Sequence, residues 1–154
     1  PTRVPAAGAT GSPATLGLPG LTQTAVSRTP QAVRPEEALA LIRRGSAAAV
    51  DPDGALAEAD AATVAHWRRK YRPGEVRDRL ATIRRAFDAV REPQETWERK
   101  GRKYYLKTTT DADGRMHHTY VVVRDGRIET WVSRNQRGTT ENKRGGILLQ
   151  RQGG

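Results

Sequence analysis

The chain has 154 residues, 36% of them hydrophobic, and its formal net charge at pH 7 is +10. This length allows one ordinary domain with a tail, and the mean hydropathy of −0.74 indicates a modest core. The absence of cysteine excludes a disulfide framework and a thiolate zinc site. No apolar run reaches the roughly 18 residues that a transmembrane helix requires, and no signal peptide is visible.

The positive charge predicts a polyanionic partner: nucleic acid, an acidic protein or an anionic membrane surface. Residues 1–34 carry three Arg and no acid, residues 35–90 ten basic and nine acidic residues, and residues 91–154 fourteen basic and eight acidic residues. The polyanion is therefore expected to bind the C-terminal part. Because the chain starts with Pro1 rather than Met, we expect a piece excised from a longer product, at its C-terminal end.

Pro, Gly, Ala, Ser and Thr dominate residues 1–34, and no apolar periodicity runs through them. Such a segment buries too little apolar surface to offset the entropy that it would lose on ordering. We therefore predict a flexible linker, of the kind that tethers a C-terminal cargo domain to a carrier.

Three helices are predicted before Pro93. The first begins at Pro35, in PEEALALIRRG, and ends at Gly45. The second extends from Ala55 to Tyr71. The third, in PGEVRDRLATIRRAFDAVREP, has one apolar stripe with spacings of four and three. We expect this stripe to pack on the following sheet; it consists of Val76, Leu80, Ile83, Phe87 and Val90.

After Pro93 the apolar period changes toward two, which predicts strands. ETWER is a short first strand, and RKYYLKTTT, MHHTYVVVR and RIETWVS are longer ones, separated by the turns DADG and DG. RNQRGTTENKRGG is a polar, basic loop before a last strand, ILLQRQ. The predicted fold class is α+β, with N-terminal helices packed on a four- to five-stranded antiparallel sheet. The predicted parts are the linker at 1–34, a helical cap at 35–72 and a core at 73–154.

Side chains alternate between the two faces of a strand, so His117 and His118 point to opposite faces, and Lys103, Tyr105 and Lys107 share one. One face must pack on the third helix, and the other presents polar and basic side chains to solvent. The register between the strands is not evident from the sequence, so which set faces solvent stays open.

The order of these parts resembles the barnase–EndoU–colicin–RelE group of ribonuclease toxins, above all members at the C-termini of phage-encoded and polymorphic toxin proteins. The resemblance covers about residues 73–152: an amphipathic helix ending in REPQETW, then GRKYYLKT, HTYVVVRDGRIETWVSRN and a basic loop before a final strand. A strand, a DG-type turn and a strand ending in Thr and an aromatic residue form a recurrent pattern of that group.

The resemblance implies a RelE-like fold and a toxin that cleaves RNA, either tRNA or mRNA, without a metal or other cofactor. Many members are paired with an immunity protein, so an acidic immunity protein that covers the basic sheet is expected as a second partner. We further expect a monomer without membrane insertion, secreted or delivered as an effector that acts in the cytoplasm of a target cell.

Metal-free RNA cleavage, in which the 2′-OH attacks the adjacent phosphate, needs a base, an acid and cations for the pentavalent phosphate. Histidine suits the proton transfers because its ordinary pKa is about 6.5, and Lys and Arg suit the phosphate. The predicted catalytic residues are His117, His118, Lys103, Thr130 and Arg134. At most one histidine is expected to be catalytic, because the two lie on opposite faces. Thr130 stands where the resemblance implies a functional Thr or Ser.

The predicted substrate-binding residues are Lys107, Tyr105, Arg127, Asn135, Thr139 and Thr140. Aromatic rings can stack on bases, although core packing also explains a strand tyrosine. Strand lysines also serve as edge protection, and Arg134 is equally well explained as a surface residue. Members of the group do not share one catalytic set, so the scaffold alone does not assign these roles.

Two other classes remain open. A non-catalytic nucleic-acid-binding module would bind RNA in a salt-sensitive way without cleaving it. A toxin of the ADP-ribosyltransferase type would need an Arg, a Ser-Thr-Ser or a Glu-x-Glu arrangement on facing strands; only TTT at residues 108–110 resembles this, and no Glu-x-Glu follows it. No zinc-deaminase or HExxH pattern occurs, and the acids of residues 91–154 are scattered singly, against a two-metal nuclease. No metal site is predicted.

Overall fold

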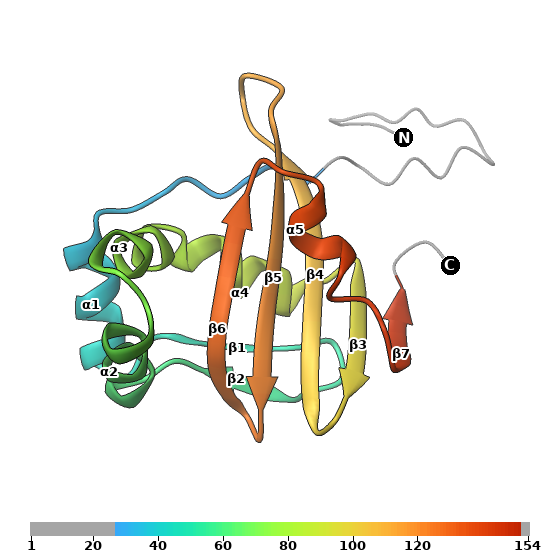
Figure 1. Ribbon diagram of the computed structural model, residues 1–154, viewed down its shortest axis with the longest axis horizontal. Helices are drawn as coiled ribbons and strands as arrows, with labels where there is room; N and C mark the ends of the chain where they lie inside the picture. The colour runs from blue at the N-terminus through green and yellow to red at the C-terminus, as the bar shows by residue number, and fades with distance from the viewer. Residues whose placement is uncertain (1–26, 152–154) are drawn as a thin grey trace, which may run out of the picture.

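The structure, a computed structural model, describes residues 27–151. Within this range the chain forms five helices and seven strands (Figure 1): α1 (Pro35–Arg43), β1 (Ala48–Val50), β2 (Leu56–Glu58), α2 (Ala61–Lys70), α3 (Pro73–Ala81), α4 (Ile83–Arg91), β3 (Glu95–Arg99), β4 (Arg102–Thr110), β5 (Met116–Arg124), β6 (Arg127–Arg134), α5 (Gly138–Glu141) and β7 (Ile147–Arg151). None of these helices is both long and apolar enough to cross a membrane.

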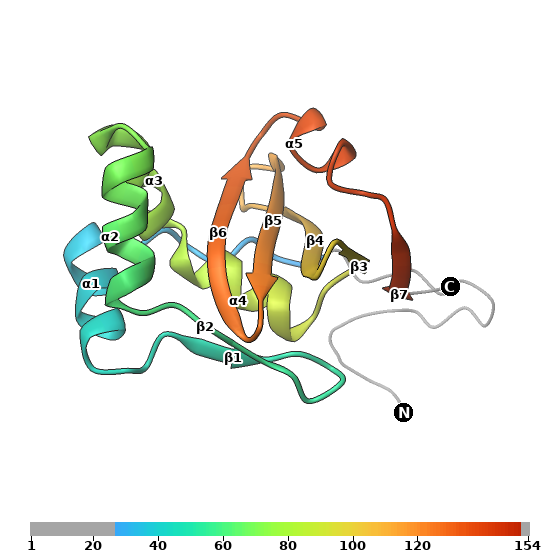
Figure 2. The same cartoon turned by 60° about the horizontal axis from the view of Figure 1, so that its bottom comes forward.

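The strands form one curled sheet, a half-barrel, in the order β1-β2-β6-β5-β4-β3-β7. Neighbouring strands are antiparallel except β2 and β6, which meet in a single parallel pair. The sheet curls around α4, which contacts β1, β4, β5 and β6, while α2 and α3 pack beside β6 (Figure 2). The predicted α+β class, with N-terminal helices and a mostly antiparallel sheet, is confirmed. The sheet is larger than predicted because a β1–β2 hairpin adds two strands to the five beyond Pro93.

Residues 48–58 form the β1–β2 hairpin, in a region where the sequence predicted the start of a helix. The side chain of Asp51 closes the turn: its Oδ1 accepts hydrogen bonds from the backbone N–H of Asp53 (2.9 Å) and of Ala55 (2.8 Å). Helix α2 starts only after its N-cap, Asp60. The alanine-rich composition favours a helix, and the side-chain bonds of the turn override that propensity.

The third predicted helix is divided into α3 and α4 at Thr82, whose φ of −102° and ψ of 20° are not helical. Its apolar stripe is buried throughout, as expected. The indole Nε1 of Trp131 donates a hydrogen bond to the carbonyl of Arg79 (2.7 Å) and lies 3.2 Å from Thr82 Oγ1. The indole of Trp131 therefore supplies the hydrogen bond that the Arg79 carbonyl lacks where the helix is interrupted. Beyond this interruption α4 begins as a separate helix that packs on the sheet.

The register of the strands decides which side chains face α4. It pairs Lys107 with Thr119 and Thr108 with His118. Lys107 contacts Asp88 of α4. Lys107 and the side chains that alternate with it on the same side of the sheet therefore form the face that packs on α4, named the α4 face below. The opposite face of β4, β5 and β6, named the α5 face below, carries Tyr104, Leu106, Thr108, His118, Tyr120, Val122, Thr130, Val132 and Arg134.

Three residues of β4 that were predicted for catalysis or RNA binding lie on the α4 face, engaged with carboxylates. The Lys107 side chain is 2% exposed, and its Nζ lies 3.0 Å from Asp88 Oδ2. The Tyr105 hydroxyl donates to Asp51 Oδ2 (2.7 Å), and burial together with this bond raises the pKa of Tyr105 well above its usual range. Lys103 Nζ is 3.7 Å from the same carboxylate. The structure therefore places Lys107 and Tyr105 in the core rather than at an open surface, whereas Lys103 is 29% exposed at its edge.

Residues 27–34 are joined to the end of β4. The backbone N–H of Thr29 donates to the carbonyl of Thr110, and the N–H of Thr110 donates to that of Ser27, both at 3.0 Å. A further bond, of 2.7 Å, joins the hydroxyls of Thr29 and Thr109. Residues 1–26 of the linker predicted at 1–34 lie outside the described residues, and Ser27 and Thr29 of its remaining part make these contacts with the domain.

Replacement of Lys107 by Met is expected to lower the free energy of unfolding. Removing one member of a buried, hydrogen-bonded pair typically costs about 1–3 kcal/mol, and Lys107 pairs with Asp88 in the core. Urea unfolding measures this loss, with Lys100→Met, at an exposed position, as the control. A Lys107→Met variant whose free energy of unfolding is unchanged would contradict this structural role of Lys107.

Candidate active site

A cleft of about 1070 Å³, named the α5 cleft below, lies between the sheet and the segment that carries α5. Figure 1 shows α5 in front of β4 and β5. The cleft is lined by Thr108, Arg115, Met116, His118, Asn135, Arg137, Thr140, Glu141 and Arg144. Three arginines against one glutamate make it cationic, and a cleft of one sign concentrates ligands of the other.

His118 is the titratable group at the base of the α5 cleft. The pleat of β5 directs it to the α5 face, where it is 7% exposed. Its Nδ1 lies 2.9 Å from the hydroxyl of Thr108, its cross-strand neighbour, which fixes the ring. Its Nε2 has no hydrogen-bond partner within residues 27–151. This atom is not fully buried, because Thr96 Oγ1 is the one buried side-chain atom of these residues that lacks a partner. Nε2 is therefore the nitrogen that is available to a ligand.

Burial lowers the pKa of His118 below its ordinary value of 6.5, and the charges of Arg137 and Arg144 lower it further, while Glu141 opposes them. An imidazole of this kind is neutral at pH 7 and can accept a proton. A neutral base among cations suits the deprotonation of a hydroxyl beside an anionic group.

The segment between β6 and β7 is held over the sheet by Glu95 of β3. The Arg144 guanidinium forms a two-pronged ion pair with this carboxylate, with Nε to Oε1 and Nη2 to Oε2 both at 2.8 Å. These hydrogen bonds are the main reason that the pKa of Glu95 lies below its usual value. Gly146 passes so close to β3 that a Cβ would lie 2.2 Å from the carbonyl oxygen of Glu98, so a side chain cannot be accommodated there. The position of Arg144 in the cleft therefore depends on β3.

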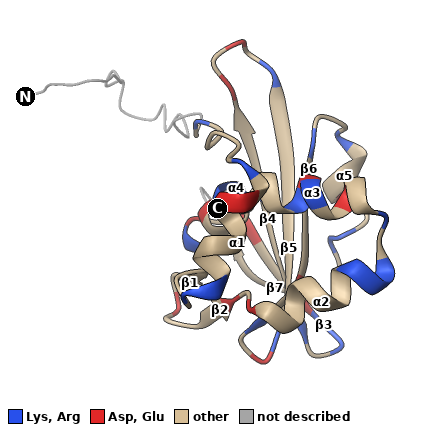
Figure 3. Ribbon diagram, turned by 90° about the vertical axis from the view of Figure 1, so that its left-hand side faces the viewer, with Lys and Arg blue, Asp and Glu red and all other residues tan. Residues whose placement is uncertain are grey.

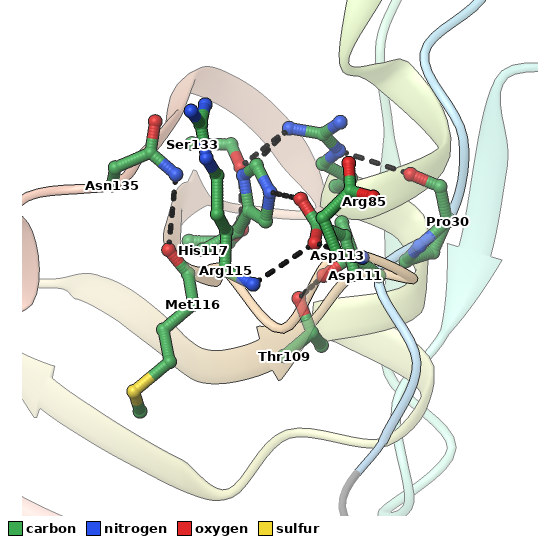
Figure 4. Close-up of polar contacts among 12 residues, drawn as sticks. Pro30, Arg85, Thr109, Asp111, Asp113, Arg115, Met116, His117, Ser133 and Asn135 are labelled. Atoms are coloured by element: carbon green, nitrogen blue, oxygen red, sulfur yellow. Dashed lines mark hydrogen bonds and ion pairs between the residues drawn. The ribbon is translucent and has the colours of Figure 1, made fainter.

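His117 occupies a different environment, on the α4 face (Figure 4). Its Nε2 is 2.8 Å from Asp111 Oδ2, and its Nδ1 is 3.3 Å from Nη1 of Arg85. Because arginine can only donate, Nδ1 accepts this bond and Nε2–H donates to Asp111. The same Nη1 is 3.4 Å from the hydroxyl of Ser133. Both ring nitrogens of His117 are engaged within the protein, so neither is available to a substrate.

Asp111 links the His117 environment to the α5 cleft. Its Oδ1 accepts hydrogen bonds from the backbone N–H of Asp113 and of Arg115, both at 2.9 Å, and so closes the β4–β5 turn (Figure 4). This turn projects beyond the neighbouring strands and carries both acidic and basic residues (Figure 3). Since Arg115 lines the cleft, Asp111 positions one of its cations.

The predicted site residues are only partly brought together. In or beside the α5 cleft lie His118, Asn135 and Thr140, with Arg134 across from His118 and Thr139 in α5. Thr130 lies farther along the same face, where its hydroxyl accepts a hydrogen bond from Arg79 Nε (2.9 Å). The remaining ones lie elsewhere: Lys103, Tyr105, Lys107 and His117 face α4, and Arg127, at the other end of β6, is 3.4 Å from Asp60.

Five polar residues that line the cleft were not among the predicted ribonuclease site residues: Thr108, Arg115, Glu141, Arg137 and Arg144. The basic composition of residues 134–146 is a signal for the last two, but it does not show over which part of the sheet they lie. Thr108 can be recognised only from the register that pairs it with His118.

Comparisons of the chain with protein-family models, with curated proteins and with solved structures found no match in any of the three. Within residues 27–151, no three side chains of the His, Asp or Glu type lie close enough together to hold a metal ion. The function must therefore be argued from the geometry of the cleft.

The substitution Arg137→Gln is expected to raise the pKa of His118 toward 6.5, because it removes the strongest of the charges that disfavour the imidazolium. Titration of the His118 ring protons by NMR measures the change. Arg124→Gln, at the far end of β5, makes the same change in net charge and should leave the His118 pKa unaltered. A wild-type His118 pKa at or above 6.5 would contradict this description of the cleft.

Proposed function

We propose that this chain is a metal-independent endoribonuclease and that the α5 cleft is its active site. The observation that carries the proposal is the combination at His118: a buried imidazole with a lowered pKa, one ring nitrogen open to the cleft, and Arg115, Arg137 and Arg144 around it. A neutral base beside several cations matches a reaction in which a ribose hydroxyl attacks its own phosphodiester.

In the proposed mechanism, Nε2 of His118 accepts the proton of the 2′-OH as O2′ attacks phosphorus. The arginines stabilise the pentavalent phosphate, and the bond from phosphorus to O5′ then breaks, leaving a 2′,3′-cyclic phosphate. Tyr120 lies two residues beyond His118 on the same face, and burial raises the pKa of its phenol. The phenol is therefore protonated at neutral pH and can supply the proton that the leaving 5′ oxygen needs.

The resemblance to the barnase–EndoU–colicin–RelE group supports the proposal from the sequence side. We propose that this chain shares three properties with that group: a RelE-like fold, a tRNA or mRNA substrate, and a role as a toxin. We propose further that the domain is an effector delivered to a target cell, and that an acidic immunity protein neutralises it. Because the cleft is cationic, such a protein would block it and neutralise its charge together.

Incubation of the protein with total tRNA and with an mRNA, in EDTA, tests the proposed function. We expect fragments that end in 2′,3′-cyclic phosphate. His118→Ala should lower the rate by about 100-fold or more, the typical contribution of a general base. His117→Ala is the matched control on the neighbouring position; it should lower stability and retain most of the activity of the folded protein, since His117 is engaged with Asp111 and Arg85.

The other outcomes separate the alternatives. RNA that stays intact but binds with strong salt dependence would indicate a non-catalytic nucleic-acid-binding module. Loss of cleavage in His117→Ala and not in His118→Ala, with both variants folded, would move the active site to the α4 face. RNA that is neither cut nor bound would overturn both RNA functions, and modification of protein targets with NAD would then be tested.

A further inference from the structure

Arg79 of α3 is a buried arginine that forms no ion pair with any residue in 27–151. It is 6% exposed. Its Nε donates to the hydroxyl of Thr130 (2.9 Å), its Nη1 donates to the carbonyl of Glu75 (3.3 Å), and the guanidinium lies 3.7 Å from the centre of the Tyr71 ring. These neutral partners orient the group and leave its charge uncompensated. Because a buried charge is costly unless it is paired, an anionic partner from outside would complete the arrangement.

Arg79 lies at the end of the α5 face beyond Tyr120. A pocket of about 190 Å³ between α3 and β6 is lined by Arg79, Thr82, Ser133 and Arg134, with Glu75 and Asp78 as its two acids. Glu75 Oε1 already accepts a hydrogen bond from the backbone N–H of Arg72. The Thr82 hydroxyl donates to the carbonyl of Asp78 (2.9 Å), and the Ser133 hydroxyl accepts from that of Thr119 (3.0 Å). The groups of this pocket that suit an anion are therefore its two arginines, and its volume is large enough for one tetrahedral anion.

The pairing of β5 with β6 relates the pocket to the α5 cleft. Arg134 is directly across from His118, and Tyr120, the next residue of β5 on that face, pairs with Val132. Lys143 covers the ring of Tyr120, with its Nζ 4.7 Å from the ring centre. Cations therefore continue from the α5 cleft past Tyr120 to Arg79, and this gives an RNA strand a defined path across the sheet.

We propose that Arg79 and Arg134 form a subsite for a second phosphate of the RNA. This inference rests on the proposed function, because the roles of His118 and Tyr120 set the direction of the strand. With His118 at the 2′-OH and Tyr120 at the leaving 5′ oxygen, the nucleotide that departs lies on the Tyr120 side. The subsite therefore takes the phosphate on the 3′ side of that nucleotide. Arginine suits it because its planar guanidinium binds phosphate through two parallel hydrogen bonds.

Non-cleavable dinucleotides with a 2′-O-methyl group test the subsite without relying on catalysis. Calorimetric titration compares a dinucleotide that ends in a 3′-phosphate with the same dinucleotide that ends in a 3′-hydroxyl. We expect the wild type to bind the phosphorylated form about tenfold more tightly, the order of one charge-assisted contact. Arg134→Gln and Arg79→Lys should each reduce this preference to less than about threefold. A 5′-phosphate on the dinucleotide should confer no preference that depends on Arg134.

Controls keep the result interpretable. Arg77→Gln makes the same charge change as Arg134→Gln at an exposed position of α3 outside the pocket, and it should retain the preference. Arg134 is exposed, so Arg134→Gln does not depend on the fold tolerating a change at the buried Arg79. Equal binding of the two dinucleotides by the wild type, or an unchanged preference in Arg134→Gln, would overturn the subsite. An intact preference in a protein that cuts no RNA would support the subsite and overturn the proposed ribonuclease.

Discussion

The packing of α4 into the curled sheet is the constraint on which the rest of the structure depends. Because β4 and β5 direct every second side chain toward this helix, the parity of a residue decides whether it belongs to the core or to the α5 cleft. His117 falls on one parity and is held between Asp111 and Arg85. His118 falls on the other and meets Thr108 and the cleft. Two identical side chains thus acquire different chemistry from the pleat of one strand.

Much of the fold could be predicted from local patterns. The apolar stripe of the third predicted helix is buried as expected, and the DG turn between β5 and β6 has positive φ at both Asp125 (52°) and Gly126 (80°), as a two-residue hairpin requires. The interruption at Thr82 could not be predicted, because it depends on a hydrogen bond from Trp131 in the sheet. The β1–β2 hairpin was not predicted, because its alanines have a high helix propensity. In the structure, the hydrogen bonds that the Asp51 carboxylate accepts in the turn overcome this propensity.

The candidate site was predictable in its residue types and not in its arrangement. Basic residues and a histidine on the sheet follow from composition and strand patterns. The burial of Lys107 against Asp88 does not, because it depends on which face of the sheet α4 packs against. Two of the three arginines around His118, Arg137 and Arg144, come from a segment whose place is set by the ion pair of Arg144 with Glu95, 49 residues away. The hydrogen bond from Arg79 to Thr130 likewise joins residues that are 51 positions apart. Such pairings carry no local signal.

The turns at Asp51 and Asp111 are the same structure in two copies of a D-x-D-G sequence. In each, Oδ1 accepts from the backbone two and four residues ahead, and the glycine has a positive φ, 86° at Gly54 and 81° at Gly114. These bonds are local, so each hairpin can close within microseconds of the chain becoming available. The second oxygen of Asp51, Oδ2, accepts its hydrogen bond from Tyr105, which lies 54 residues later in the chain. During synthesis from the N-terminus, the turn at Asp51 can therefore form before β4 has been made, and its second carboxylate oxygen gains the Tyr105 hydroxyl only when β4 joins the sheet.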